Sequence, residues 1–390
     1  MLFTGQSLVT GRSANGQVIT PTALNPQVVL MPNGGVRTLG ADQDAPVSLG
    51  VLLDRARVRD YVDLVEADAG LAGQTMAATL GKYLAAAMPS TGFIMANCGL
   101  GASPFAQRTV GTVVWRNILL QVERVATFCL MRGLPLRVVV VDVDGESDAG
   151  TAKAPWMATK LAYWDDLNAA VRGIAGPVMS QDIIIATDQM GAGAGGGVAL
   201  AQLQLAIDNP TKFLCVGPKY HHTPVDGIHI DALSQAIRGA EFGRVLKRRL
   251  VDGVSVLPPY LGPATISGTT VTAPFLGEMT GGMIVETALI SDPEAPYAKG
   301  VSFHQTGGNS VGVSSASIVA GNLVAELSAV PTGTAPYLGV ARRPFPTGVG
   351  PTVGLRACFR DQATEVFDIN GDNYPMYRFP AHWETPITAE

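Results

Sequence analysis

The sequence has few charged residues, no long basic segment and no long apolar run. Only 15% of its 390 residues are charged, and the formal net charge is −5. The longest basic run is the Lys-Arg-Arg triplet at residues 247–249, which we assign to the solvated end of a helix. We therefore expect no nucleic-acid partner. Without about twenty consecutive apolar residues or a basic leader before an apolar run, the sequence predicts neither a membrane span nor signal-dependent secretion.

Cysteine is also scarce, and its spacing argues against disulfides and against a cysteine metal site. The four cysteines form no CxxC pair and lie far apart, at positions 98, 129, 215 and 358. Three of them lie in apolar segments, so we expect buried free thiols. Hydrophobic residues make up 47% of the chain, which is enough for a full core without metals or disulfides.

From residue 70 to residue 250 short β-type runs alternate with amphipathic segments. A length of 390 residues suits two compact units, and this alternation predicts that the first is a parallel sheet wrapped by helices. Gly133 and Pro135 end one of these helices before a continuous β-branched run. The predicted helices cover residues 74–88, 115–130, 156–171, 198–207 and 232–250, and the predicted strands cover residues 93–96, 137–143, 183–186 and 213–216.

After about residue 255 the pattern changes to short alternating runs separated by Gly, Pro, Ser and Thr. Examples are residues 270–272, 283–290 and 317–323. We predict a catalytic domain over residues 1–255 and a β-sandwich module over residues 256–390, with Pro258 and Pro259 near the joint. Met1 stands only a few residues before the first candidate site residue, so we also expect either a lost preceding module or an unusually abrupt start.

Three residues in this layout suit nucleophilic catalysis. Ser7 follows the first short strand in a Gly-Gln-Ser corner, where a glycine allows a sharp turn. Asp226 and His229 follow the last predicted strand and precede the final helix. Because reactive groups collect at the carboxyl ends of parallel strands, the three side chains are expected to meet. A spacing of three residues lets Asp226 orient His229, which would accept the Ser7 proton.

The chain resembles the SGNH hydrolases, and within them carbohydrate esterases similar to sialate O-acetylesterases. Four blocks carry the resemblance in the family's order over residues 1–250: Gly-Gln-Ser at 5–7, Gly-Ala-Ser-Pro at 101–104, Gly-Glu-Ser-Asp at 145–148 and Asp-Gly-Ile-His at 226–229. The resemblance implies a three-layer α/β/α, flavodoxin-like domain with a five-stranded parallel sheet. It also implies a Ser7–His229–Asp226 triad and an oxyanion hole formed by the N–H groups of Ser7 and Gly101.

One position departs from the family pattern. The family usually has Gln, Asn or His directly before the Gly-Glu pair, but this chain has Asp144, and an ionised carboxylate cannot donate to an oxyanion. Three alternatives follow: Asp144 is protonated, Asn97 donates in its place, or the hole has two donors. Asp144 could equally cap the loop after a strand. Glu146 is expected to hold its loop by hydrogen bonds, and Asp144, Glu146 and His222 are also the candidate substrate-binding residues.

Two further motifs suggest other chemistry. Residues 191–196 read Gly-Ala-Gly-Ala-Gly-Gly, a GxGxxG match, but no acidic residue ends the next strand, so we interpret the segment as a rim of the ester site. His221 and His222 are adjacent and have no partner at helical ligand spacing, so we expect no metal. Trp383 lies in an aromatic-rich stretch that would either stack on sugar rings or pack against the β module.

These observations predict a serine esterase that needs no cofactor and removes O-acetyl or similar short acyl groups from a saccharide or polysaccharide. The alternatives are an inactive carbohydrate-binding or structural protein with the same fold, and a lipase or esterase that acts on lipid esters. The C-terminal module would bind polysaccharide or anchor the chain in an assembly, either a homo-oligomer or a virion. The Gly/Ser/Thr-rich tail favours a phage-tail setting over a cytoplasmic one.

Overall fold

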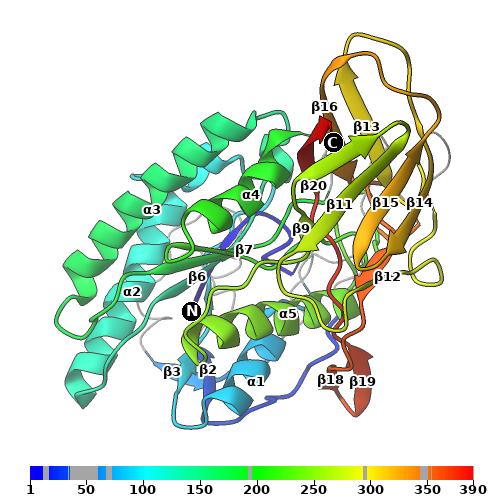
Figure 1. The fold of residues 1–390 in the computed structure, drawn as a ribbon. Coiled ribbons are helices and arrows are strands. Elements are labelled where there is room, and N and C mark those ends of the chain that lie inside the picture. The colour runs from blue at the N-terminus through cyan, green and yellow to red at the C-terminus, as the bar shows by residue number, and fades with distance from the viewer. Residues whose placement is uncertain are drawn as a thin grey trace.

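The computed structural model describes residues 1–11, 17–33, 35, 60–66, 73–191, 196–292, 297–342, 350–352 and 354–389. Its first unit is built on a parallel sheet with the strand order β5-β1-β6-β7-β8 (Figure 1). The parallel sheet predicted by the alternating pattern is confirmed, and so are the five strands that the resemblance implied. The strands are β1 (Leu2–Gly5), β5 (Ala96–Asn97), β6 (Val139–Val143), β7 (Ile184–Thr187) and β8 (Phe213–Cys215).

Helices cover both faces of this sheet and make three layers. Val140, Ile185 and Phe213 face a core shared with α2, α3 and α4. Neighbouring Val139 and Leu214 face the opposite core, shared with α1 and α5. Apolar side chains on both faces explain why the strands appear in the sequence as unbroken apolar runs. The helices are α1 (Ala77–Ala87), α2 (Val113–Arg132), α3 (Lys153–Ala175), α4 (Gly197–Asp208) and α5 (Ala232–Leu250).

The apolar run at residues 93–96 is divided between two sheets. β4 (Phe93–Ile94) pairs with β2 (Val29–Pro32), which also pairs with β3 (Tyr61–Asp63), whereas β5 pairs with β1. Two 3₁₀ helices, η3 (Phe105–Arg108) and η4 (Glu146–Asp148), lie in the loops beyond β5 and β6. These loops leave the carboxyl ends of the two strands that flank β1, so they carry their side chains to the same edge of the sheet as the end of β1.

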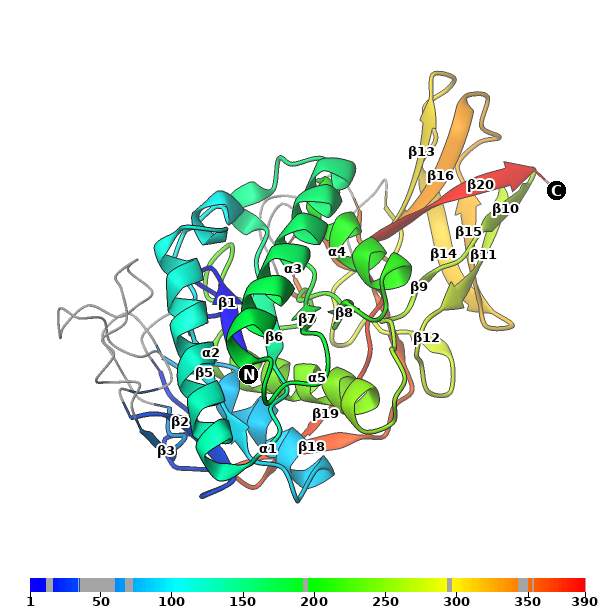
Figure 2. The same cartoon turned by 90° about the vertical axis from the view of Figure 1, so that its left-hand side faces the viewer.

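The second unit is a curled mixed sheet that stands beside the α/β unit (Figure 2). This unit consists of β-strands, as expected, but where a β-sandwich was predicted most of the strands join one curled eight-stranded sheet. Most of the strand pairs are antiparallel, but β10 and β20 run parallel. The strands of the sheet are β9 (Tyr260–Leu261), β10 (Ala264–Ser267), β11 (Thr270–Leu276), β13 (Val301–Thr306), β14 (Val313–Val319), β15 (Asn322–Leu327), β16 (Thr334–Val340) and β20 (Trp383–Ala389).

Part of the C-terminal chain returns to the first unit. The two-stranded ribbon of β18 (Val366–Ile369) and β19 (Asp372–Pro375) packs Phe367 and Ile369 against α5. The sequence pattern did not predict this ribbon. A second ribbon joins β12 (Met283–Val285) to β17 (Phe359–Asp361).

All four cysteines are buried free thiols, as predicted. Among the described residues, no helix has the length and apolar character needed to cross a membrane.

Candidate active site

Ser7 stands on a sharp turn at the carboxyl end of β1. Gly5 has φ +131°, and a Cβ at this position would lie 2.0 Å from the Val143 carbonyl oxygen. Only glycine fits because both the backbone angle and the close approach of β6 exclude a side chain. The Gln6 N–H donates to the Val143 carbonyl at 3.1 Å, and the Thr10 hydroxyl donates to the Ser7 carbonyl at 2.8 Å. The turn is therefore fixed on both sides of the serine.

The fold brings Ser7, His229 and Asp226 into one hydrogen-bonded series. The His229 Nε2 atom lies 2.8 Å from Ser7 Oγ, and His229 Nδ1 lies 2.7 Å from Asp226 Oδ2. An ionised carboxylate can only accept, so Nδ1 carries the proton and Nε2 accepts from the serine hydroxyl. This tautomer is the one in which His229 can act as a base toward Ser7.

A local turn prepares the Asp226 carboxylate for this contact. Its Oδ1 atom accepts the backbone N–H groups of Ile228 at 2.7 Å and His229 at 2.6 Å. Partial burial opposes ionisation, but the hydrogen bonds from the backbone and ring of His229 outweigh it and lower the pKa of Asp226. Asp226 is therefore a preorganised anion in the resting protein, and the spacing of three residues makes this turn possible.

The side chain before the nucleophile is tied to the loop after β6. Gln6 Nε2 donates to Glu146 Oε2 at 2.5 Å, and the Ser147 hydroxyl donates to Gln6 Oε1 at 2.6 Å. Glu146 Oε1 also accepts from the Gly191 N–H at 3.2 Å and from Lys219 Nζ at 2.8 Å. Glu146 holds its loop by hydrogen bonds, as expected. Both of its oxygens are engaged and its side chain is only 5% exposed, so these contacts give Glu146 a structural role, and its substrate contact stays a prediction.

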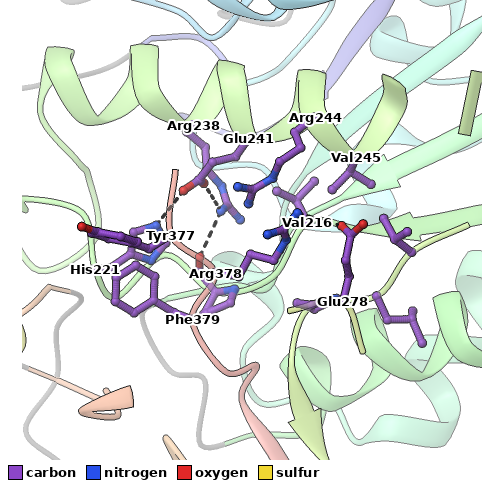
Figure 3. A pocket seen from close by; sticks show the side chains of 14 residues that line it. Val216, His221, Arg238, Glu241, Arg244, Val245, Glu278, Tyr377, Arg378 and Phe379 are labelled. Carbon is purple, nitrogen blue, oxygen red and sulfur yellow. Dashed lines mark hydrogen bonds and ion pairs between the residues drawn. The ribbon is translucent and has the colours of Figure 1, made fainter. Parts of the chain in front are cut away.

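From Glu146 a chain of buried charges runs to α5. Lys219 pairs with Glu146 and lies 3.4 Å from Asp188, which lies 3.3 Å from Arg238. Arg238 then pairs with Glu241 at 2.6 Å (Figure 3). Buried ion pairs are strongly destabilised when one member is lost. This series of ion pairs therefore links the loop that holds the nucleophile turn to the buried face of α5.

His222 lies at the end of this network and is buried against Glu241. It is 3% exposed, and its Nε2 atom lies 3.2 Å from Glu241 Oε2. Burial is the main cause that lowers the pKa of His222 to about 4, so the ring is neutral near pH 7. Through Glu241, α5 supplies the His222 ring with a buried partner that is distant in sequence, and the substrate contact of His222 stays a prediction.

His221, His222 and Glu241 also bring three potential metal ligands within 4.8 Å of one another. The fold thus supplies the carboxylate that helical spacing did not reveal. In this structure, however, both rings contact Glu241, and Arg238 donates to the same carboxylate at 2.6 Å. The Glu241 charge is therefore already compensated, and these contacts account for the cluster without a cation.

Asp144 belongs to a separate buried ion cluster. Arg108 donates to Asp144 at 2.8 Å and to Asp142 at 3.1 Å, and Lys160 contacts both carboxylates. Burial opposes ionisation, but Lys160 and Arg108 lower the pKa of Asp144 to about 2. Asp144 is therefore ionised and fully buried. Because η3 and α3 provide its two cations, the structure favours an ionised, structural Asp144 over a protonated one, and its substrate contact stays a prediction.

Two of the predicted oxyanion donors, Asn97 and Gly101, lie near the nucleophile turn, and the Asn97 amide is already hydrogen-bonded to the backbone. Asn97 Nδ2 donates to the Val9 carbonyl at 2.6 Å, while its Oδ1 accepts the Gly99 N–H at 2.8 Å. The Asn97 amide is thus used to hold the backbone around the turn. The Leu100 N–H donates to the Gly5 carbonyl at 2.9 Å, which brings the following residue, Gly101, beside the turn. Residues 192–195 of the glycine-rich segment lie outside the described residues.

The sequence did not predict most of the residues that support the site. Gln6 and Ser147 lie within the matched blocks, yet their mutual contact spans 141 positions. Arg238 carried a usable signal. It lies among Gln235 and Phe242 on the buried stripe of α5, at positions i+3 and i+4 of one helical face. A cation inside such a stripe requires a buried carboxylate partner.

The sequence matches no protein-family model and no curated protein. The structure, in contrast, matches solved structures. A carbohydrate acetylesterase from Xanthomonas citri matches with a TM-score of 0.56 over 98% of this chain and 80% of that chain, at 14% identity. NanS matches with a TM-score of 0.45 over 65% of this chain and 98% of that chain, at 11% identity. A carbohydrate acetylesterase from Sinorhizobium meliloti matches with a TM-score of 0.33 over 48% of this chain and 91% of that chain, at 14% identity.

The first of these matches carries the comparison of folds. It spans both units, so this chain shares the fold of a carbohydrate acetylesterase from the parallel sheet to the C-terminal β module. The resemblance to SGNH carbohydrate esterases that the four sequence blocks indicated is confirmed at the level of the fold.

Proposed function

We propose that this chain is a serine esterase that removes O-acetyl or similar short acyl groups from a saccharide. The observation that carries the proposal is the hydrogen-bonded series from Ser7 through His229 to Asp226. The fold shared with a carbohydrate acetylesterase supports the choice of ester. The phage-tail setting and the assembly state stay predictions from the sequence.

In the proposed reaction His229 Nε2 takes the Ser7 proton as Oγ attacks the acyl carbonyl carbon. The negative charge that develops on the carbonyl oxygen is held by the backbone N–H groups of Ser7 and Gly101. In the described part of the chain, neither N–H donates to a protein acceptor, so both are available. With Asp144 paired to Arg108 and Lys160, we propose a hole of two backbone donors.

The reaction then proceeds through acylation of Ser7 and its deacylation by water. His229 returns its proton to the sugar oxygen, the bond from the acyl carbon to that oxygen breaks, and the acyl group stays on Ser7. Water next attacks the acyl-Ser7 carbonyl carbon while His229 accepts a proton from it, which gives a second tetrahedral intermediate. The bond from the acyl carbon to Ser7 Oγ then breaks, His229 returns the proton to Oγ, and the acid and free serine are released. Asp226 stabilises the imidazolium that forms in both steps.

The two alternatives are an inactive protein and an esterase for lipid chains. Asp144 at a position where the family has an oxyanion donor would be the reason to expect an inactive protein, but Arg108 and Lys160 account for its carboxylate. An esterase for lipid chains would turn over p-nitrophenyl octanoate faster than p-nitrophenyl acetate. We expect the reverse preference.

The triad is tested with p-nitrophenyl acetate and with acetate release from a panel of O-acetylated polysaccharides. We expect Ser7→Ala and His229→Ala each to lose at least about 10⁴-fold in kcat for the small ester. The control is Ser255→Ala, which removes a hydroxyl that donates to the Pro210 carbonyl far from the turn. Turnover that is equal in the unaltered protein and both triad variants would contradict the proposal.

A further inference from the structure

A groove separate from the triad lies between the two units. Strands β16 and β20 form one wall, and Lys153 at the start of α3 and Leu200 on α4 form the other. It encloses about 740 Å³, part of it open to solvent. Figure 1 shows β20 and β16 beside α4. We propose that this groove binds the saccharide chain of the substrate at a distance from the ester, an inference that rests on the proposed function.

The apolar part of the groove has the flat surfaces that a sugar ring requires. Trp383 and Tyr337 both line it and are both partly exposed. Tyr260 meets Trp383 edge to face at 5.6 Å and 79°, and His304 stacks on Tyr337 at 4.9 Å and 22°. These neighbours fix the two rings, so little side-chain entropy would be lost when a ligand stacks on them. Pro336 extends this apolar wall.

Charged groups at the same groove suit the hydroxyls around a sugar ring. Lys153 Nζ donates to Gln204 Oε1 at 2.8 Å and lies 5.2 Å from the centre of the Trp383 ring. Two of its three N–H donors stay available after that bond. Glu384 also lines the groove; Arg342 Nη2 donates to its Oε2 at 3.4 Å, and its Oε1 supplies a further carboxylate acceptor. A lysine and a glutamate on an aromatic wall disfavour a lipid tail, which would leave both charges unsolvated, and favour a polar ligand with apolar faces.

The groove lies at the same edge of the sheet as the triad. Lys153 begins α3 just after the loop that leaves β6, and Ser147 in that loop donates to Gln6 beside the nucleophile. Lys153 follows Ser147 by six positions in the chain, so the two residues lie within about 20 Å of each other. A saccharide chain of several rings spans this distance. One ring would bind at the groove while an acetylated ring lies at Ser7.

The test compares a polymer with a small ester in the same variants. Trp383→Leu removes the ring face but keeps an apolar side chain, and Lys153→Ala removes the ammonium. We expect KM for the O-acetylated polysaccharide that the unaltered protein hydrolyses fastest to rise about tenfold in Trp383→Leu and severalfold in Lys153→Ala. The kcat/KM for p-nitrophenyl acetate is expected to stay unchanged. A polymer KM that is unchanged in both variants would overturn the proposal.

Matched controls separate loss of binding from loss of structure. Lys212 lies 4.0 Å from the centre of the Trp164 ring and pairs with Asp165, so Lys212→Ala removes a comparable lysine away from the groove. Tyr374→Leu removes a partly buried aromatic ring on β19. Both controls should leave the polymer KM unchanged, and the melting temperature of each variant shows whether it is folded.

A binding measurement keeps this inference independent of the triad. Ser7→Ala protein is titrated with the same polysaccharides by calorimetry, alone and combined with Trp383→Leu or Lys153→Ala. Weaker binding in the combined variants supports the groove even if the unaltered protein hydrolyses no ester, a result that would refute only the proposed function. Binding to none of the polymers, or binding that neither substitution weakens, overturns the groove.

Discussion

The Ser147 hydroxyl donates to Gln6 Oε1 at 2.6 Å and thereby ties the loop after β6 to the residue that precedes Ser7. Glu146 in the same loop accepts from the Gln6 amide nitrogen. The Gln6 side chain is thus held at both ends by consecutive residues. Because the Ser7 N–H belongs to the peptide bond that follows Gln6, this pair of contacts aims a proposed oxyanion donor. We regard Gln6 as a positioning residue.

Removing this positioning contact should lower kcat more than it changes KM. Gln6→Ala deletes these two bonds and a third, from the Ser147 N–H to Gln6 Oε1 at 3.3 Å. We expect kcat for p-nitrophenyl acetate to fall by about 10² because the Ser7 N–H loses its fixed direction. Ser147→Ala deletes one bond and should have a smaller effect. Steady-state kinetics check both values, and melting curves show whether the variants are folded. An unchanged kcat in Gln6→Ala would contradict the positioning role.

The carboxylate of the triad can be tested without a change of shape. Asp226→Asn keeps the size of the side chain but presents an amide to His229, which favours the wrong ring tautomer. We expect kcat to fall by about 10³–10⁴. The Asp226 side chain is 54% exposed, so the free energy of unfolding should change little. Asp231→Asn is a suitable control because Asn retains the ability to cap α5.

The sequence predicted the parts of the site that depend on order along the chain. The alternation of helix-type and strand-type apolar patterns predicted five helices and four strands after the first short strand. The ends of the first and last strands predicted that Ser7, Asp226 and His229 lie at one edge of the sheet. Each of these inferences uses contacts that the topology of a parallel sheet dictates. The curled shape of the C-terminal sheet and the return of β18 and β19 to α5 depend on packing between segments with no such rule.

The sequence did not reveal the buried partners of Asp144 and His222, for one physical reason. Both side chains are polar residues in loops at the strand ends, which is where substrate contacts are also found. Arg108 and Lys160 lie 36 and 16 positions from Asp144, and Glu241 lies 19 positions from His222. No short spacing rule joins these partners, so the sequence could not show that the two side chains are buried and paired.

The ion cluster at Asp144 should affect stability and leave the chemistry intact. Asp144→Asn leaves Arg108 and Lys160 with Asp142 as their remaining carboxylate, and we expect a loss of about 3–5 kcal/mol in the free energy of unfolding. Asp165→Asn, at an exposed ion pair with Lys212, should cost less than about 1 kcal/mol. Urea unfolding measures both. A folded Asp144→Asn variant with normal kcat would support two backbone oxyanion donors, whereas a large fall in kcat with unchanged stability would contradict the assignment.

A buried histidine gives the protein a predictable dependence on pH. His382 is fully buried and donates from Nδ1 to the Ala341 carbonyl at 2.8 Å. Burial is the main cause that lowers its pKa from 6.5 to about 4. As the pH falls below 6.5, the unfolded chain binds a proton at this ring while the folded chain does not. The free energy of unfolding therefore decreases as the pH falls from about 6.5 to about 4, and this contribution is constant above that range.

His382→Asn isolates this contribution because the Asn amide can donate near the position of Nδ1 but does not titrate. Urea unfolding at pH 7 and pH 5 measures the difference. We expect the unaltered protein to lose about 2 kcal/mol more than His382→Asn over this interval. His222, whose pKa is also lowered to about 4, acts in the same direction and stays present in both proteins, so it cancels from the comparison. Equal losses in the two proteins would show that the His382 ring is protonated in the folded state.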